Sequence, residues 1–148
     1  MLGDEILLFQ TTVTIDDKTR ILMPSKTLVK PKEQLILYDS REGYLSIYSA
    51  IEFEERLKYL QNQARREFEK GNFNQKDLYK CQLAFECARV FDKQNVDSAR
   101  RLLLGKYIME KFNFDKEVFM EGEYDHINLF DSEESFEKYK QFIKKKIL

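Results

Sequence analysis

The feature that most constrains this chain is a short pattern that occurs twice, 81 positions apart. The two copies are Thr14-Ile-Asp-Asp-Lys-Thr-Arg-Ile-Leu-Met-Pro24 and Asn95-Val-Asp-Ser-Ala-Arg-Arg-Leu-Leu-Leu-Gly105. Both contain an apolar residue, then Asp-x-x-x-Arg, then an apolar triplet and a proline or glycine. Asp16 and Arg20 therefore correspond to Asp97 and Arg101. Repetition at a fixed offset predicts a fold built from two similar units.

The segments that follow the two motifs match in the same order. Each motif is followed by a basic stretch and then by a hairpin pattern, which consists of an apolar run, a polar turn with glycine and an alternating run. The hairpins span 35–48 and 118–130. Leu45 and Ile127 correspond at an offset of 82, which we attribute to one residue inserted in the turn. A helix follows each hairpin, with Ser49 or Asp131 as its candidate N-cap.

Between the copies the pattern predicts two helices in all. Apolar residues recur at helical spacing over 51–70 and again over 74–91. The chain is therefore expected to contain a first repeat with its helix at 1–60, a helical insert at 61–92 and a second repeat with a C-terminal helix at 93–148. We expect these three parts to form one compact domain.

Several apolar residues of the insert allow more than one interpretation. Cys81 and Cys87 are six positions apart on a helix, so they point to different faces and cannot readily share a metal ion. We expect both to be small core residues. The aromatic residues fit either a core or a subunit interface, and they are Phe68, Phe73 and Tyr79.

Charge is distributed unevenly along the chain. The whole sequence has 25 Lys and Arg against 26 Asp and Glu, which excludes a histone-like polycation. Segments 14–32 and 93–111 each carry five basic and two acidic residues, so each has a net charge of +3. If the repeats pack side by side, these strips form one basic patch that suits DNA phosphates. The alternative is an ordinary solvated surface.

The Asp-x-x-x-Arg pattern has two physical interpretations. An aspartate at the head of a turn can accept backbone N–H groups and can hold the later arginine by a charge-assisted hydrogen bond. An arginine held in this way can reach a phosphate or the O6/N7 edge of guanine at low entropic cost. Alternatively, Asp16–Arg20 and Asp97–Arg101 are internal salt links that only shape the fold. Pro24 and Gly105 suit the ends of strands.

The remaining features exclude several classes of protein. The acidic N-terminus lacks the basic start of a signal peptide, and no apolar run approaches the roughly 20 residues that span a bilayer. No phosphate-binding loop, nucleophile elbow or zinc protease motif is present, and His126 is the one histidine. We expect His126 to be structural. The expectations are therefore a cytoplasmic protein without enzymatic activity, cofactor, metal ion, membrane partner or small-molecule substrate.

Taken with the repeat, three segments resemble the MraZ family of bacterial proteins, which are built from two AbrB-like halves. These segments are Thr14–Pro24, Val96–Leu104 and Phe114–Phe130. The resemblance covers almost the whole chain, including the helical insert. Thr19 stands where the family usually has glycine, which predicts a different backbone shape in the first turn.

The resemblance implies an α+β fold, a swapped-hairpin β-barrel formed by two internal repeats with helices between and after them. It also implies assembly of subunits into a ring, and regulation of transcription by binding short repeated double-stranded DNA sites in the promoter of the division and cell wall gene cluster. Family members are linked to the nucleoid. Arg20 and Arg101 match the arginines of the DNA-facing motifs, and Lys18 matches the usual motif lysine.

These observations lead to a DNA-binding transcriptional regulator as the first hypothesis. The alternative is a protein–protein module or ring scaffold, such as an antitoxin-like partner, which does not bind specific DNA. Under the first hypothesis the arginines Arg20 or Arg101 read bases, while Asp16 and Asp97 support the motifs. The residues expected to contact phosphates are Lys18, Lys26, Arg100 and Lys106.

Overall fold

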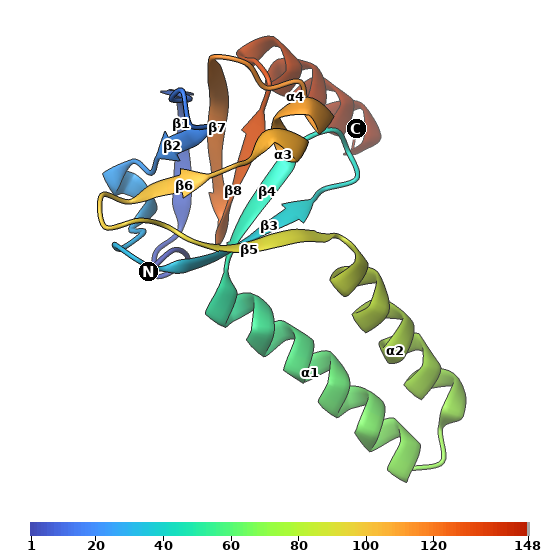
Figure 1. The fold of residues 1–148 in the computed structure, drawn as a ribbon. Helices are drawn as coiled ribbons and strands as arrows, with labels where there is room; N and C mark the ends of the chain where they lie inside the picture. The colour runs from blue at the N-terminus through green and yellow to red at the C-terminus, as the bar shows by residue number, and fades with distance from the viewer. Residues whose placement is uncertain (148) are drawn as a thin grey trace.

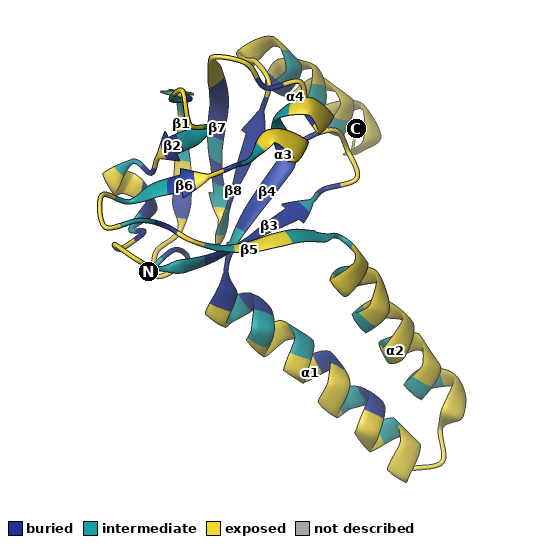
Figure 2. Ribbon diagram, in the orientation of Figure 1, coloured by how far each residue is buried: buried dark blue, intermediate teal, exposed yellow. Residues whose placement is uncertain are grey.

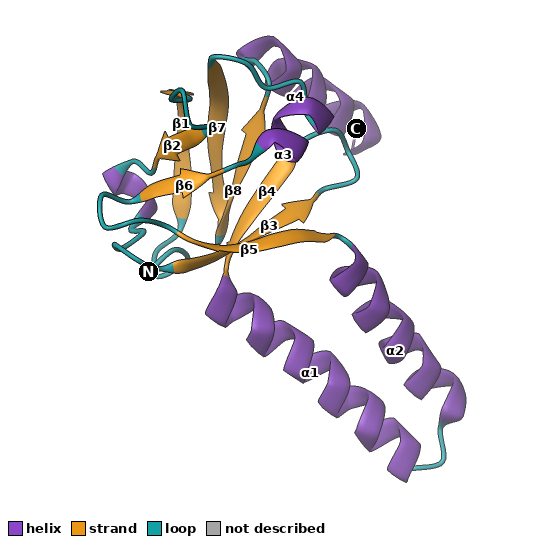
Figure 3. Ribbon diagram, in the orientation of Figure 1, coloured by secondary structure: helices purple, strands orange, loops and turns teal. Residues whose placement is uncertain are grey.

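A computed structural model describes residues 1–147, and each repeat contributes four strands to it (Figures 1 and 3). The strands of the first repeat are β1 (Leu7–Thr14), β2 (Arg20–Leu22), β3 (Gln34–Asp39) and β4 (Leu45–Ser49). Those of the second are β5 (Val90–Asn95), β6 (Arg101–Leu103), β7 (Glu117–Tyr124) and β8 (His126–Phe130). The helices are the 3-10 turn η1 (Ser25–Thr27), α1 (Ala50–Glu69), α2 (Phe73–Ala88), α3 (Lys106–Lys111) and α4 (Glu133–Ile147). Both repeats therefore follow the order that the sequence predicts.

The two repeats exchange strands within one sheet. Its order is β1-β7-β8-β4-β3-β5, so the first strand of each repeat pairs with the hairpin of the other repeat. The hairpins themselves meet where β4 pairs with β8. Exchanging the repeats only reverses this order, so the sheet has an approximate two-fold symmetry. Strands β2 and β6 form a separate two-stranded antiparallel ribbon.

The symmetry axis passes through two pairs of equivalent residues. Ile21 lies opposite Leu102 in the β2–β6 ribbon, and both side chains are fully buried. Ser46 lies opposite Asn128 between β4 and β8, where the Ser46 hydroxyl donates to Asn128 Oδ1 over 2.8 Å. The two copies of the motif, far apart in the sequence, therefore come together as related halves.

The spacing between the repeats changes at two places. The bond from Ile15 N to Lys116 O, 2.8 Å, has an equivalent from Val96 N to Glu33 O, 2.9 Å. Ile15 and Val96 are 81 positions apart, but Glu33 and Lys116 are 83 apart. Compared with the first repeat, the second repeat thus has two additional residues between its motif and its hairpin, in the segment that contains α3. It has one residue fewer at the β7–β8 turn. The expected single insertion in the turn is wrong.

The core lies between the sheet and the β2–β6 ribbon and draws on both repeats. The α+β class with a mostly antiparallel sheet is confirmed, but the strand pairings among residues 1–147 do not close into a barrel. Strands β1 and β5 remain edges of the sheet, since β1 meets β2 only through an isolated bridge between Ile15 and Ile21. Buried residues at the centre include Leu7, Leu35, Leu45, Val96, Val118, Ile127 and Leu129.

Helices α1 and α4 cover parts of the outer face of the sheet. Phe136 of α4 packs against Phe119 and Phe130, and this cluster also contains Tyr44. At the start of α1, Phe53 packs against Tyr38. Because each helix begins directly after its own hairpin, the repeat places the two helices on different regions of the sheet.

The helical hairpin formed by α1 and α2 extends away from the sheet (Figures 1 and 2). Helix α2 has no buried residue, and Cys81 and Cys87 are both exposed, so the expectation that they lie in a core is wrong. The physical reason is that α2 packs mainly against α1, touches the sheet only near its C-terminal end, where Glu86 accepts from Tyr38, and leaves its other face open. The helix also ends earlier than the apolar pattern predicts, because residues 90–95 pair with β3 instead.

Candidate nucleic-acid interface

The first motif forms a tight turn around one carboxylate. Asp16 Oδ1 accepts hydrogen bonds from the backbone N–H groups of Lys18 and Arg20, each 2.9 Å long. Asp16 Oδ2 accepts a third from Arg20 Nε over 2.8 Å. Thr19 has φ of 60°, in the left-handed region. This is a backbone conformation that glycine adopts at low cost. Thr19 therefore keeps a glycine-like backbone shape, and the different shape expected from its side chain is not seen.

The second motif repeats this geometry. Asp97 Oδ1 accepts from the N–H groups of Ala99 and Arg101 at 2.9 and 2.8 Å, and Asp97 Oδ2 accepts from Arg101 Nε at 2.8 Å. Arg100 has φ of 63°, which matches Thr19 in the first turn. Each aspartate thus fixes both the turn and the direction of its arginine, as the sequence pattern predicts.

Pairing of β2 with β6 brings the two motifs together. Arg20 lies opposite Leu103, and Leu22 lies opposite Arg101. Arg20 Nη1 is 3.9 Å from Asp97 Oδ2, so one carboxylate interacts with the arginines of both repeats. The Arg20 side chain is 23% exposed and that of Arg101 is 40% exposed. The two guanidinium groups are therefore restrained but still reachable from solvent.

Further cations lie at both ends of this ribbon. Leu104 N donates to Thr19 O over 2.9 Å, which places the start of α3, with Lys106, next to the turn that holds Lys18. Met23 N donates to Arg100 O over 2.9 Å, which places η1, with Lys26, next to the second turn. We call the ribbon with these two ends the motif ribbon. It brings together all six cations predicted from the sequence to contact DNA.

The electrostatics of the motif ribbon favour a permanent positive charge. The pKa of Asp16 is lowered, chiefly by the hydrogen bond from the Arg20 backbone N–H and further by the Arg20 side chain. Arg101 lowers the pKa of Asp97 in the same way. Both carboxylates are therefore ionised at neutral pH. Together with exposed Asp17 they offset three of the six positive charges.

Sequence reasoning missed two apolar residues on the motif ribbon. Leu22 is 53% exposed and Leu103 is 41% exposed, although each belongs to an apolar triplet. The period-2 alternation of a strand could have identified them, because Ile21 and Leu102 point inward and their neighbours then point outward. Exposed aliphatic groups next to arginines can contact a thymine methyl group or a sugar.

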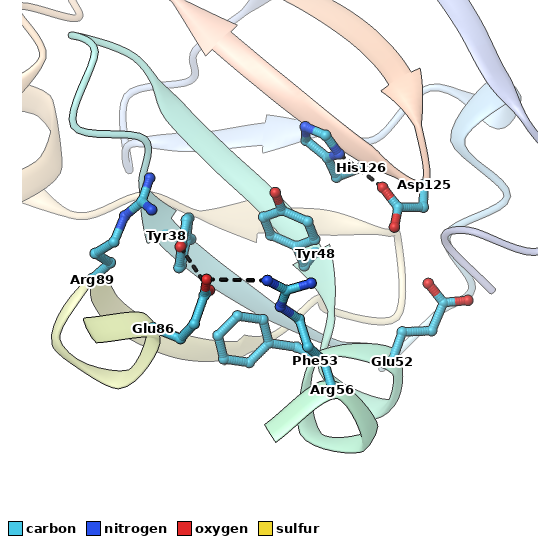
Figure 4. Close-up of a pocket in the computed structure, with 9 residues that line it drawn as sticks. All are labelled: Tyr38, Tyr48, Glu52, Phe53, Arg56, Glu86, Arg89, Asp125 and His126. Atoms are coloured by element: carbon cyan, nitrogen blue, oxygen red, sulfur yellow. Dashed lines mark hydrogen bonds and ion pairs between the residues drawn. The ribbon is translucent and has the colours of Figure 1, made fainter. Parts of the chain in front are cut away.

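The other polar cluster lies in a pocket of about 460 Å³ between the helical hairpin and the sheet (Figure 4). Its polar groups are largely paired with one another. Glu86 accepts from Tyr38 at 2.8 Å and from Arg56 at 3.3 Å. His126 stacks on Tyr48, with ring centroids 4.6 Å apart. This arrangement is typical of a stabilising contact between elements.

His126 itself is held by two carboxylates. Its Nδ1 lies 2.9 Å from Asp125 Oδ1, and its Nε2 lies 3.4 Å from Glu123 Oε2. Burial opposes the charged form, but the hydrogen bonds to Glu123 and Asp125 outweigh it and raise the pKa of His126. The ring at the start of β8 therefore contacts both the end of β7 and the turn that follows it.

Within 1–147, no group of three or more His, Cys, Asp or Glu side chains is arranged to hold a metal ion. Over the same residues, no helix has the length and apolar character needed to cross a membrane.

Fold and site together define a class: a two-repeat α+β protein in which the repeats exchange strands and pair their Asp-x-x-x-Arg turns on one ribbon. The chain is similar to the transcriptional regulator MraZ of Mycoplasmoides gallisepticum. The two are 28% identical over 134 residues, which are 86% of this chain and 87% of the relative. This similarity confirms the resemblance that the motifs indicate. No family model matches the chain.

Proposed function

We propose that this protein is a transcriptional regulator that binds double-stranded DNA through the motif ribbon. The observation that carries the proposal is the pairing of two equivalent Asp-x-x-x-Arg turns, which presents two restrained arginines between two pairs of cations. Arginines held by a carboxylate lose little entropy on binding and suit bidentate contact with guanine. The similarity to a protein named as a transcriptional regulator supports the same function.

In this proposal the side chains divide between two tasks. Lys18 and Lys106 at one end, and Lys26 and Arg100 at the other, contact phosphates and position the duplex. Arg20 and Arg101 read base edges. Asp16 and Asp97 keep the arginines in place without contacting DNA.

We further propose that subunits assemble into a ring that engages several short promoter repeats at once, as the MraZ resemblance implies. Linked sites raise overall affinity by about 10² to 10⁴ without new contacts. In this proposal each chain is one domain with a swapped-hairpin body, repeats at 1–60 and 93–148 and an insert at 61–92. The regulated genes are those of division and cell wall synthesis, and the protein is cytoplasmic and associated with the nucleoid.

Fluorescence anisotropy with a duplex from the region upstream of the protein's own gene tests DNA binding. We expect log K to fall linearly with log salt, because bound cations release counterions from the phosphates. Arg20→Ala and Arg101→Ala are each expected to weaken specific binding by about 1–3 kcal/mol. Arg66→Ala, an exposed arginine on the helical hairpin, is the matched control and leaves affinity unchanged.

Absence of binding at low salt contradicts the proposal and favours the second candidate, a protein–protein module. The observation behind this candidate is the exposed apolar face of α2, where Leu78 and Phe85 are each 50% exposed. A module of this kind binds a partner protein through the helical hairpin and shows no salt-dependent affinity for DNA.

A further inference from the structure

In each motif the apolar triplet that follows the arginine has one exposed member, and it is the middle one. Leu22 is 53% exposed in the first triplet, and Leu103 is 41% exposed in the second. The other four members are all buried, and they are Ile21, Met23, Leu102 and Leu104. The motif ribbon therefore presents the same aliphatic side chain twice, at equivalent positions 81 residues apart.

The two exposed leucines share one face of the motif ribbon with the two motif arginines. Strand pairing sets Leu103 directly opposite Arg20, and Leu22 directly opposite Arg101. Residues that lie opposite each other in an antiparallel pair point to the same face, with Cβ atoms about 4.5–5.5 Å apart. The outer face therefore carries the arginines on one diagonal and the leucines on the other.

The arginines are held close to the ribbon, so the shorter leucines reach a similar depth. The Nε atom of each arginine donates to the aspartate of its own motif over 2.8 Å. Arg20 Nη1 also lies 3.9 Å from Asp97 Oδ2, and the Arg20 side chain is only 23% exposed. An arginine tied to a neighbouring carboxylate in this way does not extend fully into solvent. A surface that the guanidinium groups touch is therefore within reach of Leu22 and Leu103 as well.

The surroundings of the leucines are basic, which limits what can cover them. Two cations lie at each end of the ribbon, and they are Lys18 with Lys106 and Lys26 with Arg100. An occupant must therefore offer negative charge at its edges and an apolar group at its centre. The major groove of DNA has this composition, since phosphates border it and the C5 methyl group of thymine projects into it. At about 12 Å it is also wide enough to admit a two-stranded ribbon.

We infer that Leu22 and Leu103 are specificity-determining residues, which contact the C5 methyl groups of thymines in the major groove. The inference rests on the proposed DNA binding and adds a second component to its readout. The arginines select guanine by hydrogen bonds, and the leucines select thymine by apolar contact. Cytosine carries a hydrogen atom at C5, so a thymine-to-cytosine change at these positions removes the contact.

Replacement of thymine by deoxyuridine tests the contact, because it removes the C5 methyl group and leaves base pairing unchanged. The thymines of the upstream duplex are replaced one at a time, and fluorescence anisotropy measures the affinity of the full chain. Burial of one methyl group corresponds to about a fourfold change in affinity, so we expect a loss of this size at the contacted positions. Leu22→Ala is expected to abolish the loss at one set of positions, and Leu103→Ala at another. Arg20→Ala weakens binding to every duplex but keeps the preference for thymine.

The matched control is Leu78→Ala on the helical hairpin, which lies away from the motif ribbon (Figure 1). Leu78 is 50% exposed, so this variant removes a leucine of similar exposure. It is expected to keep both the affinity and the thymine preference of the wild type. Thermal melts monitored by circular dichroism confirm that each variant is folded.

Two outcomes overturn the inference and leave the proposed DNA binding in place. One is a wild-type protein that binds thymine and deoxyuridine duplexes equally well. The other is a pair of folded leucine variants that keep the full preference for thymine, because the methyl group then acts through the shape of the duplex or through another side chain. Absence of binding to any duplex at low salt overturns the proposed function and this inference together.

Discussion

The strands of the paired repeats and helix α2 both have regular apolar patterns, but only the strands bury their apolar residues. Each strand of the sheet finds its partner within the chain, so Leu35, Leu45, Ile127 and their neighbours are completely enclosed. Helix α2 has one partner helix and no buried residue. The comparison teaches that apolar periodicity predicts a helix or strand reliably, whereas it predicts burial only where a second surface is available to cover it.

The largest expected effect is the loss of unfolding free energy when a buried side chain of the paired repeats is removed at the symmetry axis. Ile21→Ala leaves a cavity where Ile21 meets Leu102, and we expect the free energy of unfolding to fall by about 3 kcal/mol. Urea denaturation measures it. Leu22→Ala, on the same strand but half exposed, is the control and should cost much less. Equal losses for the two variants would contradict the assigned core.

A difference of intermediate size is expected from backbone strain, which is present in the first motif and absent from the α1–α2 connection. Thr19 has φ of 60° in the first motif, whereas the connection between α1 and α2 uses Gly71 at φ of 76°. A β-branched residue in the left-handed region costs about 1–2 kcal/mol, so Thr19→Gly is expected to stabilise by roughly 0.5–1 kcal/mol after the added chain entropy. Gly71→Ala should destabilise by about 1 kcal/mol. Thermal melts with opposite shifts support both assignments, and shifts of the same sign refute one of them.

A smaller effect is expected on the open face of the helical hairpin. Leu78→Ala removes a side chain that is half exposed, so the free energy of unfolding should change by no more than about 0.5 kcal/mol. Leu60→Ala on α1, where the leucine is 6% exposed, is expected to cost about 2 kcal/mol or more. If Leu78→Ala proves as costly as Leu60→Ala under dissociating conditions, α2 is covered within the chain and the comparison fails.

The smallest effect is the pH dependence contributed by His126 at the junction of sheet and hairpin. Its pKa is raised in the folded state, so the charged ring stabilises the fold at acidic pH. This contribution is complete below the unfolded pKa of about 6.5 and is lost as pH rises through the folded pKa. Unfolding free energy should therefore decline slightly from pH 6 to pH 8.5. His126→Gln is expected to remove that slope, and an unchanged slope would assign it to other groups.

Much of the fold was predictable because the sequence contains two copies of one pattern, which can be compared with each other. Two copies of one pattern indicate which residues are equivalent, and equivalence predicted that Asp16 and Asp97 would hold matching turns. The pairing of Ile21 with Leu102 was not predictable in register, since strands of three residues carry too little pattern to fix it. The shift of two residues before β7 also escaped detection, because the short helix α3 has no counterpart of equal length.

The candidate site was predictable in its residues but less so in its arrangement. Charge counting identified Lys26 and Lys106, yet only the backbone bonds at Arg100 and Thr19 show which turn each lysine accompanies. The exposure of Cys81 and Cys87 was missed for a different reason. A helical apolar face has the same sequence signature whether its cover comes from the same chain or from another molecule.

Because the two repeats exchange their first strands, they are expected to stay together even when the polypeptide chain between them is cut. Because β1 is held by β7 and β5 by β3, the two repeats remain interlocked by their sheet even without the peptide link between α1 and α2. A protease cut at Gly71 is therefore expected to yield two fragments that stay together under native conditions and separate only on denaturation. Two shorter polypeptides, produced separately, would then reconstitute one molecule by complementation.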